Sequence, residues 1–194
     1  RHIVVLGGAG GIGQAIAMRF AQQPGANVYV LGRNTDKLVQ ASATMARDSA
    51  ASFVPVACDL ADPEGIAQAL AGVPRLDVLV NAAGSIPRKS LLESQPDDWR
   101  GAWSDKVLGA IESSRLACER MRESGGGVII NIIGVSGVRL NPKSILTTTA
   151  NAALIAFTQS LGAQSVDWNV RVVGINPGLT ATARTADLSG GKGG

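Results

Sequence analysis

The sequence is poor in residues that build metal sites, disulfide scaffolds and many catalytic centres. Its 194 residues include two cysteines, one histidine and one tyrosine. Cys58 and Cys118 have neither a CxxC motif nor the Cys/His spacing of a metal site, and both lie in apolar surroundings. We therefore expect two buried free thiols, and no metal. His2 precedes the first apolar run, at the end away from the glycines of residues 7–13, so we do not expect it to be catalytic, although histidine is well suited to act as a general base.

Long apolar runs and clustered charges are also missing. No window approaches the ~18 apolar residues needed to span a bilayer, and the opening residues 1–6 are too short for a signal peptide. The 18 basic and 15 acidic residues are scattered, with no basic cluster of the kind that tracks a nucleic-acid backbone. We therefore expect a cytoplasmic protein with no membrane partner and no nucleic-acid partner.

Short apolar runs alternate along the chain with segments of helical periodicity. The runs are nearly continuous, as in strands that helices cover on both faces. They predict six strands, at residues 3–6, 27–31, 53–56, 78–80, 128–133 and 170–175. The periodic segments predict helices at about 12–22, 36–47, 63–71, 97–123 and 150–167. This alternation predicts a single α/β domain over residues 1–194, a doubly wound parallel sheet of the Rossmann type.

Two features of the second half bear on assembly and completeness. The helix predicted at 150–167 begins with residues that are apolar nearly all round, so it is either deeply buried or faces another subunit. We favour a homo-oligomer, either a dimer or a tetramer. The chain begins with Arg1 and ends on the glycine-rich residues 189–194. We expect that it lacks a last strand and a substrate lid at its C-terminus.

A glycine-rich turn joins the first predicted strand to the first predicted helix. Its sequence, Gly-Gly-Ala-Gly-Gly-Ile-Gly over residues 7–13, contains G-x-G-x-x-G. Glycine permits a tight turn and lets backbone N–H groups approach a pyrophosphate, which the helix N-terminus also favours. A merely flexible turn is the weaker alternative, because the motif follows a strand and opens a helix. The predicted cofactor-binding residues of this turn are Gly7, Gly10, Gly11, Ile12 and Gly13.

The end of the second predicted strand bears on which cofactor is bound. A site for NAD would place Asp or Glu here, whereas this chain has Gly32 and Arg33. A guanidinium can grip a 2′-phosphate bidentately, so Arg33 and Asn34 favour NADP, with NAD still possible. The alternative is that Arg33 is solvated and that Asn34, Thr35 and Asp36 only cap the next helix.

Together these features resemble the short-chain dehydrogenase/reductase family over most of the chain. The family's T-G-x-x-x-G-x-G turn resembles residues 6–13, with Leu6 replacing Thr. Its acid on the adenine side, its N-N-A-G motif and its P-G motif resemble residues 59–60, 81–84 and 177–178. Thr180 stands in a place that family members use near the nicotinamide carboxamide. The cofactor-binding residues that this resemblance implies are Asp59, Leu60, Asn81, Ala82, Ala83, Gly84, Pro177, Gly178 and Thr180.

The chain departs from the family at every catalytic position. The family uses Ser, Tyr and Lys, the last two spaced Y-x-x-x-K, together with a helical Asn. Here Thr147 stands in the place of Tyr, Asn151 in that of Lys, Gly134 in that of Ser and Lys106 in that of Asn. The only tyrosine, Tyr29, lies in the second predicted strand, where we expect it to be part of the core.

Hydride transfer to or from a carbon that bears oxygen needs an acid/base group with a suitable pKa. A threonine hydroxyl is a far weaker acid than a phenol beside an ammonium. Lys106 is the best candidate, because a desolvated lysine can act as acid and base. The alternative is a solvated lysine on a helix surface. The other candidate catalytic residues, expected around the same pocket, are Ser136, Ser144, Thr147 and Asn151.

Two functions remain open at this point. The first is an NAD(P)-dependent oxidoreductase that acts on a small alcohol or carbonyl substrate with an atypical acid/base group. The second is a non-catalytic NADP-binding sensor or regulatory subunit, since the cofactor motifs are retained while the catalytic residues are replaced. The fold alone cannot choose between them.

Overall fold

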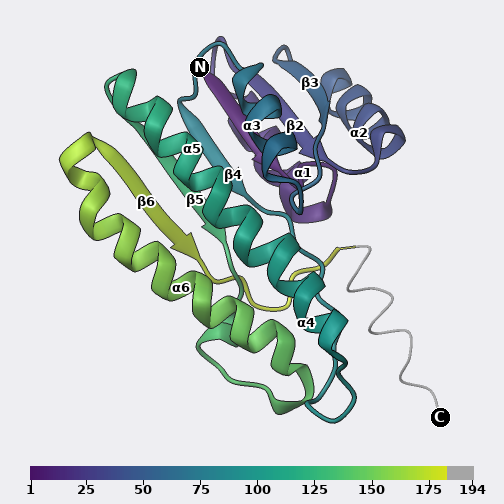
Figure 1. Ribbon diagram of the computed structural model, residues 1–194. Coiled ribbons are helices and arrows are strands. Elements are labelled where there is room, and N and C mark those ends of the chain that lie inside the picture. Colours follow the sequence, from purple (N-terminus) through teal and green to yellow (C-terminus); the bar gives the residue numbers. More distant parts are fainter. Residues whose placement is uncertain (183–194) are drawn as a thin grey trace.

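A six-stranded parallel sheet forms the centre of the protein (Figure 1). The structure is a computed structural model that describes residues 1–182. The strands are β1 (His2–Leu6), β2 (Asn27–Gly32), β3 (Ser52–Ala57), β4 (Val78–Asn81), β5 (Gly127–Ile132) and β6 (Val170–Ile175). Their order is β3-β2-β1-β4-β5-β6, which confirms the predicted doubly wound Rossmann-type fold. The order reverses between β1 and β4, the point at which such sheets bind ligands at their carboxyl ends.

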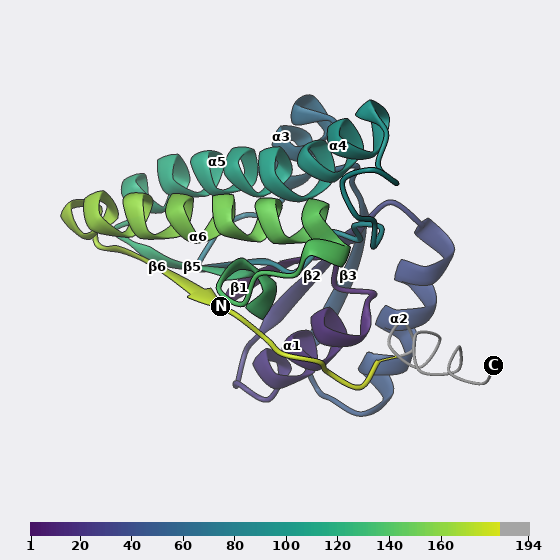
Figure 2. The same ribbon diagram turned by 90° about the horizontal axis from the view of Figure 1, so that it is seen from below.

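Helices cover the sheet in two layers, which Figure 2 shows edge-on. On one side lie α1 (Gly11–Ala21) and α2 (Thr35–Arg47); on the other lie α3 (Pro63–Ala71), α4 (Pro96–Ala102), α5 (Gly109–Glu123) and α6 (Ile145–Ser165). The central strand β1 contributes to both apolar cores, with Val4 and Leu6 on the α3 and α5 side and Ile3 and Val5 on the α1 and α2 side. Its continuous apolar run is explained by burial on both faces.

Two observed helices differ in detail from the predicted ones. Helical structure runs through the whole of the predicted 97–123, but a π-helical segment, Trp103–Leu108, joins α4 to α5. The apolar period did not disclose the wider turns, since helical character continues through the segment. The last helix begins at Ile145 and not at residue 150. The sequence did not predict its first turns because they contain a run of polar threonines. In the structure these threonines fit the helix, and Thr149 Oγ1 donates to the Ile145 carbonyl.

The surface of α6 is divided between core and solvent. Leu146, Ala150 and Leu154 are buried, whereas Ala152 and Ala156 are exposed. Together with α5, the helix borders an apolar groove of about 350 Å³ that includes Phe157 and Leu161. Thus α6, whose sequence is apolar nearly all round at residues 151–157, is buried in the described structure on one side only.

The two cysteines are buried free thiols, as predicted. Burial, with the nearby Asp59 and Asp62 carboxylates, raises the pKa of Cys58 to about 11. Burial also raises the pKa of Cys118. None of the helices in the described part of the chain is long and apolar enough to cross a membrane. The glycine-rich end, 189–194, lies outside the described residues.

Candidate active site

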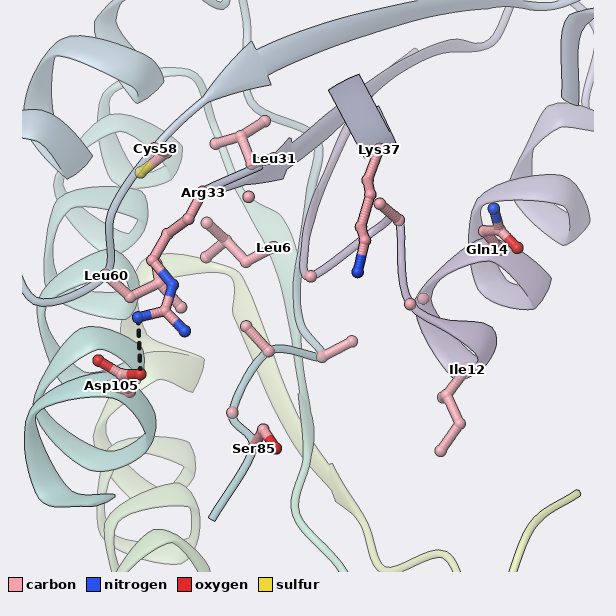
Figure 3. A pocket seen from close by; sticks show the side chains of 18 of the residues that line it. Leu6, Ile12, Gln14, Leu31, Arg33, Lys37, Cys58, Leu60, Ser85 and Asp105 are labelled. Carbon is pink, nitrogen blue, oxygen red and sulfur yellow. Dashed lines mark ion pairs between the residues drawn. The ribbon is translucent and has the colours of Figure 1, made fainter. Parts of the chain in front are cut away.

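Two connected clefts open at the carboxyl ends of the strands. The first, of about 670 Å³, is lined by the glycine turn and by the ends of β2 and β3, and we call it the glycine-turn cleft (Figure 3). The second, of about 440 Å³, lies between the segments that follow β4 and β5 and the first turns of α6, and we call it the α6 cleft. Ile12, Ala82, Ala83 and Gly84 line both clefts. A ligand bound in one can therefore extend into the other.

The glycine turn leaves a helix N-terminus open toward the cleft. Gly7 has φ +78°, and a Cβ at this position would lie 2.7 Å from the backbone of Ala83. A Cβ on Gly13 would clash with the Gly7 carbonyl oxygen. Gly10 caps α1 without a side chain, and the first turn of α1 carries no acid. These features fit a bound pyrophosphate, which needs close backbone approach and amide donors. All five cofactor-binding residues predicted in the turn line the cleft.

Two cations flank the glycine-turn cleft beyond the turn. Arg33 lies in its wall and pairs with Asp105 at 3.2 Å, as the dashed line in Figure 3 marks. Lys37, from the first turns of α2, also lines the cleft. Sequence reasoning missed Lys37, although its position four residues after Arg33 was a usable signal. Asn34 does not line the cleft; its Oδ1 accepts a hydrogen bond from Lys37 N at 2.9 Å and caps α2. The adjacent predicted residues Asp59 and Leu60 do line it.

Asn81 lies in a buried polar network that holds the end of β4. Its Nδ2 donates to Asn131 Oδ1 at 2.8 Å and to Ser114 Oγ at 3.1 Å, and its Oδ1 accepts from Ser113 Oγ at 2.8 Å. Asn131 Nδ2 donates in turn to Thr158 Oγ1 at 2.9 Å. The network joins β4 and β5 to α5 and α6. Asn81 lines neither cleft, but it fixes the strand from which the following residues 82–84 enter both.

Lys106 is buried, which rules out the alternative of a solvated surface lysine. The residue is 8% exposed, and its Nζ donates to the Ile133 carbonyl at 2.7 Å. It lies in the wall of the α6 cleft. Gly84 makes room for it, since a Cβ at that position, where φ is +120°, would lie 2.9 Å from Lys106 Cβ. The π-helical segment thus places Asp105 in one cleft and its neighbour Lys106 in the other, and π-helical turns are frequent at functional sites.

The structure brings all five predicted catalytic residues to the α6 cleft, namely Lys106, Ser136, Ser144, Thr147 and Asn151. Asn151 is 1% exposed and donates through Nδ2 to Ser136 Oγ at 2.8 Å. Within the described part of the chain its Oδ1 has no hydrogen-bond partner. A Cβ on Gly134, where φ is +129°, would lie 2.8 Å from Asn151 Nδ2. A serine therefore does not fit at position 134 without a shift of Asn151.

The segment after β6 reaches both clefts. Pro177 and Gly178, two of the residues predicted to bind the cofactor, line the α6 cleft. Thr180 lines neither cleft, and its Oγ1 donates to the Gly178 carbonyl at 3.2 Å. Thr182 lines the glycine-turn cleft instead, with its side chain 2.8 Å from where a Cβ on Gly11 would lie. Sequence reasoning missed Thr182; its place two residues after Thr180 was the only signal.

The whole arrangement matches a known family. Residues 1–192 match the family model for short chain dehydrogenases. The chain belongs to the short-chain dehydrogenase/reductase family. An uncharacterised oxidoreductase of Staphylococcus aureus is 31% identical over 187 residues, which cover 94% of this chain and 79% of that relative.

Solved structures of short-chain dehydrogenases/reductases share this fold. The L-sorbose reductase from Gluconobacter frateurii, complexed with NADPH and L-sorbose, has a TM-score of 0.91 at 30% identity, covering 100% of this chain and 76% of that one. A 3-oxoacyl-[acyl-carrier protein] reductase with bound NAD from Brucella melitensis has a TM-score of 0.88 at 27% identity, covering 97% and 74%. The family is one of nicotinamide-dependent oxidoreductases.

The α6 side chains at this short-chain dehydrogenase/reductase site are a hydroxyl and an amide. Thr147 and Asn151 lie one turn apart on that helix, where the family pattern has a phenol and an ammonium. The single tyrosine, Tyr29, packs against the core under α3 and α5, and its hydroxyl lies 3.3 Å from His2 Nδ1. Neither Tyr29 nor His2 lines either cleft. The buried ammonium of the α6 cleft therefore comes from Lys106, in the π-helical segment.

Proposed function

We propose that the protein transfers a hydride between NADP and a small alcohol or carbonyl compound, with Lys106 as its acid/base group. The observation that carries this proposal is the continuity of the two clefts. One end presents an open helix N-terminus to a pyrophosphate, and the other presents a buried ammonium to a reacting oxygen.

The glycine-turn cleft would hold the cofactor. Amide groups at the start of α1 would receive the pyrophosphate, and the loop at residues 82–84 would lie between the two clefts. Arg33 and Lys37 provide two cations for a 2′-phosphate, which supports NADP over NAD. The cofactor supplies or accepts the hydride when bound.

Lys106 would handle the proton. In the direction of reduction, the carbonyl carbon gains the hydride and the carbonyl oxygen takes a proton from Lys106 Nζ, which solvent then returns. The Ile133 carbonyl holds the ammonium in the cleft wall at 2.7 Å, so its position is set before substrate arrives. Ser136 and Asn151 form a hydrogen-bonded pair in the same cleft and would orient the substrate oxygen.

A non-catalytic NADP-binding sensor or regulatory subunit is the second candidate. The observation that favours it is the replacement of all four family catalytic positions beside a retained glycine turn. Binding without turnover distinguishes it from the first candidate.

We also propose a homo-oligomer in the cytoplasm. The support for an oligomer is the groove between α5 and α6, together with the exposed Ala152 and Ala156 on α6, because a two-fold dimer buries the same patch of both subunits. Two free buried cysteines support a reducing compartment.

A fluorescence titration of the protein with NADPH, and a second one with NADH, test the cofactor proposal. NADPH is expected to bind more tightly, and failure of both to bind would overturn both candidate functions.

Turnover with a panel of small carbonyl compounds tests whether the protein is an enzyme and whether Lys106 is its acid/base group. Lys106→Met is expected to abolish turnover while leaving NADPH binding within a few fold, whereas Lys143→Met, an exposed lysine outside both clefts, is the matched control. Tight binding with no turnover in the unaltered protein would select the sensor.

A further inference from the structure

Arg88 is an exposed residue that lines the α6 cleft. It lies in the loop that follows β4, and its Nε donates to Ser144 Oγ at 3.2 Å. Ser144 is 5% exposed and immediately precedes α6. An arginine has five N–H donors in a planar fork, so a bond through Nε leaves the two terminal nitrogens to bind something else.

The neighbouring cation, Lys89, differs from Arg88 because it is paired with a carboxylate. Lys89 Nζ contacts both oxygens of Asp98, at 2.7 and 2.8 Å, and is thus neutralised by a carboxylate. The ion pairs formed among residues 1–182 include no carboxylate for Arg88. A hydroxyl orients the Arg88 guanidinium but does not neutralise it.

The electrostatic character of the α6 cleft is one-sided. Its ionisable lining residues, within the part of the chain that the structure describes, are Arg88 and Lys106, both cationic. The acid of the π-helical segment, Asp105, lines the glycine-turn cleft and pairs there with Arg33. The start of α6 adds partial positive charge and has no acid in its first turn. A cleft lined by one sign of charge attracts ligands of the other sign.

We propose that the substrate of this site carries a carboxylate that binds to the terminal nitrogens of Arg88. The substrate is then an oxo acid, or in the reverse direction a hydroxy acid. Reduction of such an acid rests on the proposed function, whereas binding of its carboxylate to Arg88 does not. The oxo acid, NADPH and one proton give the hydroxy acid and NADP⁺, and the carboxylate is unchanged. A bidentate guanidinium–carboxylate pair would fix the carbonyl relative to Lys106.

Equilibrium binding to the protein saturated with NADP⁺ tests the proposal without requiring turnover. The probes are pyruvate, acetoacetate and levulinate, which separate the carbonyl and carboxylate by different lengths, and the methyl ester of each. We expect at least one acid to bind about tenfold or more tightly than its ester, because hydrogen bonds to charged groups are strong. Arg88→Gln is expected to remove this preference. Arg171→Gln is the matched control, since it removes the same charge from an exposed arginine at the start of β6, outside both clefts.

The outcomes separate the two proposals. Equal binding of every acid and its ester, or a preference that survives Arg88→Gln, would overturn the carboxylate site. Reduction of the neutral compound butane-2,3-dione as efficiently as of the preferred acid would also overturn it, and would leave the oxidoreductase proposal standing. Acid-selective binding that depends on Arg88, with no reduction of any probe, would keep the carboxylate site and favour the sensor.

Discussion

Adjacent side chains serve different ends of the site in this protein. Asp105 and Lys106 follow one another in the π-helical segment, yet the first pairs with Arg33 in the glycine-turn cleft and the second donates to Ile133 in the α6 cleft. Arg88 and Lys89 likewise differ, since only Lys89 has a carboxylate partner among the described residues. Side-chain direction, which follows from local backbone geometry, thus decides the role of each charge.

Removal of the Arg33 side chain is expected to change the cofactor preference. Arg33→Ala should weaken NADPH binding by about tenfold and leave NADH binding nearly unchanged, because a charge-assisted hydrogen bond to the 2′-phosphate is lost. The expected loss of NADPH affinity is small for a charge-assisted bond, since the Arg33 side chain is 63% exposed and solvent screens its charge. Isothermal titration with both cofactors measures it.

The ion-pair partner of Arg33 provides a second variant for the same measurement. Asp105→Asn removes the carboxylate 3.2 Å from Arg33 and is expected to tighten NADPH binding without tightening NADH binding. Equal losses for both cofactors in Arg33→Ala would mean that the arginine supports the cleft and does not read the phosphate.

Much of the candidate site could be predicted from the sequence at the residue level, because a run of glycines between a strand and a helix is typical of nucleotide binding. Asn34, Asn81 and Thr180 were harder, since a motif gives a position and no side-chain direction. Asn34 caps α2 and Asn81 turns into a buried network. The positive charge of the α6 cleft was not predictable, because Arg88 comes from a loop without a periodic pattern.

At the scale of elements, the π-helical segment and the loop after β4 fit one another. Gly84 has φ +120°, and the Lys106 side chain passes where its Cβ would be. The sequence predicted helix through this region and could not reveal the π-helical turns, which insert no distinctive residue. Likewise Gly134 and Asn151 fit one another across β5 and α6. Two positions that differ from the family, Gly134 and Asn151, therefore lie next to one another in the folded protein.

Addition of a methyl group at Gly84 is expected to disturb stability and chemistry together. Gly84→Ala should lower the free energy of unfolding by about 1–3 kcal/mol, because it forces a side chain into a positive-φ conformation. It should also reduce turnover more than NADPH binding, since the contact is to Lys106 Cβ and Cγ, close to the backbone. Urea denaturation and steady-state kinetics measure the two effects.

A glycine in the adjacent helix provides the control. Gly101 lies in α4, is exposed, and a Cβ there would meet nothing within 4 Å. Gly101→Ala should therefore raise stability by up to about 1 kcal/mol through helix propensity. If Gly84→Ala behaved like Gly101→Ala, the close packing of Gly84 on Lys106 would be refuted.

At the scale of the whole molecule, the site lies at the carboxyl ends of the strands, and the opposite ends of the strands contribute to stability. There the Asp77 carboxylate accepts hydrogen bonds from His2 N and from Arg75 Nε, each at 2.8 Å, and so joins the start of β4 to β1. Burial tends to raise the pKa of Asp77, but the His2 hydrogen bond and the Arg75 guanidinium outweigh it and hold the pKa below its usual range.

The stability that Asp77 contributes depends on pH. Because its pKa is lower in the folded state, the contribution is present above the unfolded-state pKa of about 3.9 and is lost as the pH falls through the folded-state value. Asp77→Asn should lower stability at pH 7 by about 1 kcal/mol, a modest figure because solvent screens Arg75. The difference from the unaltered protein should shrink toward pH 3. Denaturation at several pH values measures it, with the exposed Asp167→Asn as control. A difference that stayed constant from pH 7 to pH 3 would contradict the assignment.

Assembly is the last property that belongs to the whole molecule. The apolar α6 pattern predicted burial or a subunit contact, and the structure leaves Ala152 and Ala156 exposed beside the groove between α5 and α6. A charge placed in the centre of a buried contact loses its hydration, so Ala156→Arg should dissociate an oligomer that uses this face. The helix itself should tolerate arginine, which has a high helix propensity. Sedimentation equilibrium should give a multiple of the 19.9 kDa chain mass for the unaltered protein and for Ala43→Arg on the exposed side of α2, and the chain mass itself for Ala156→Arg. A monomeric unaltered protein would refute the homo-oligomer, whereas an oligomer that survives Ala156→Arg would move the interface away from α6.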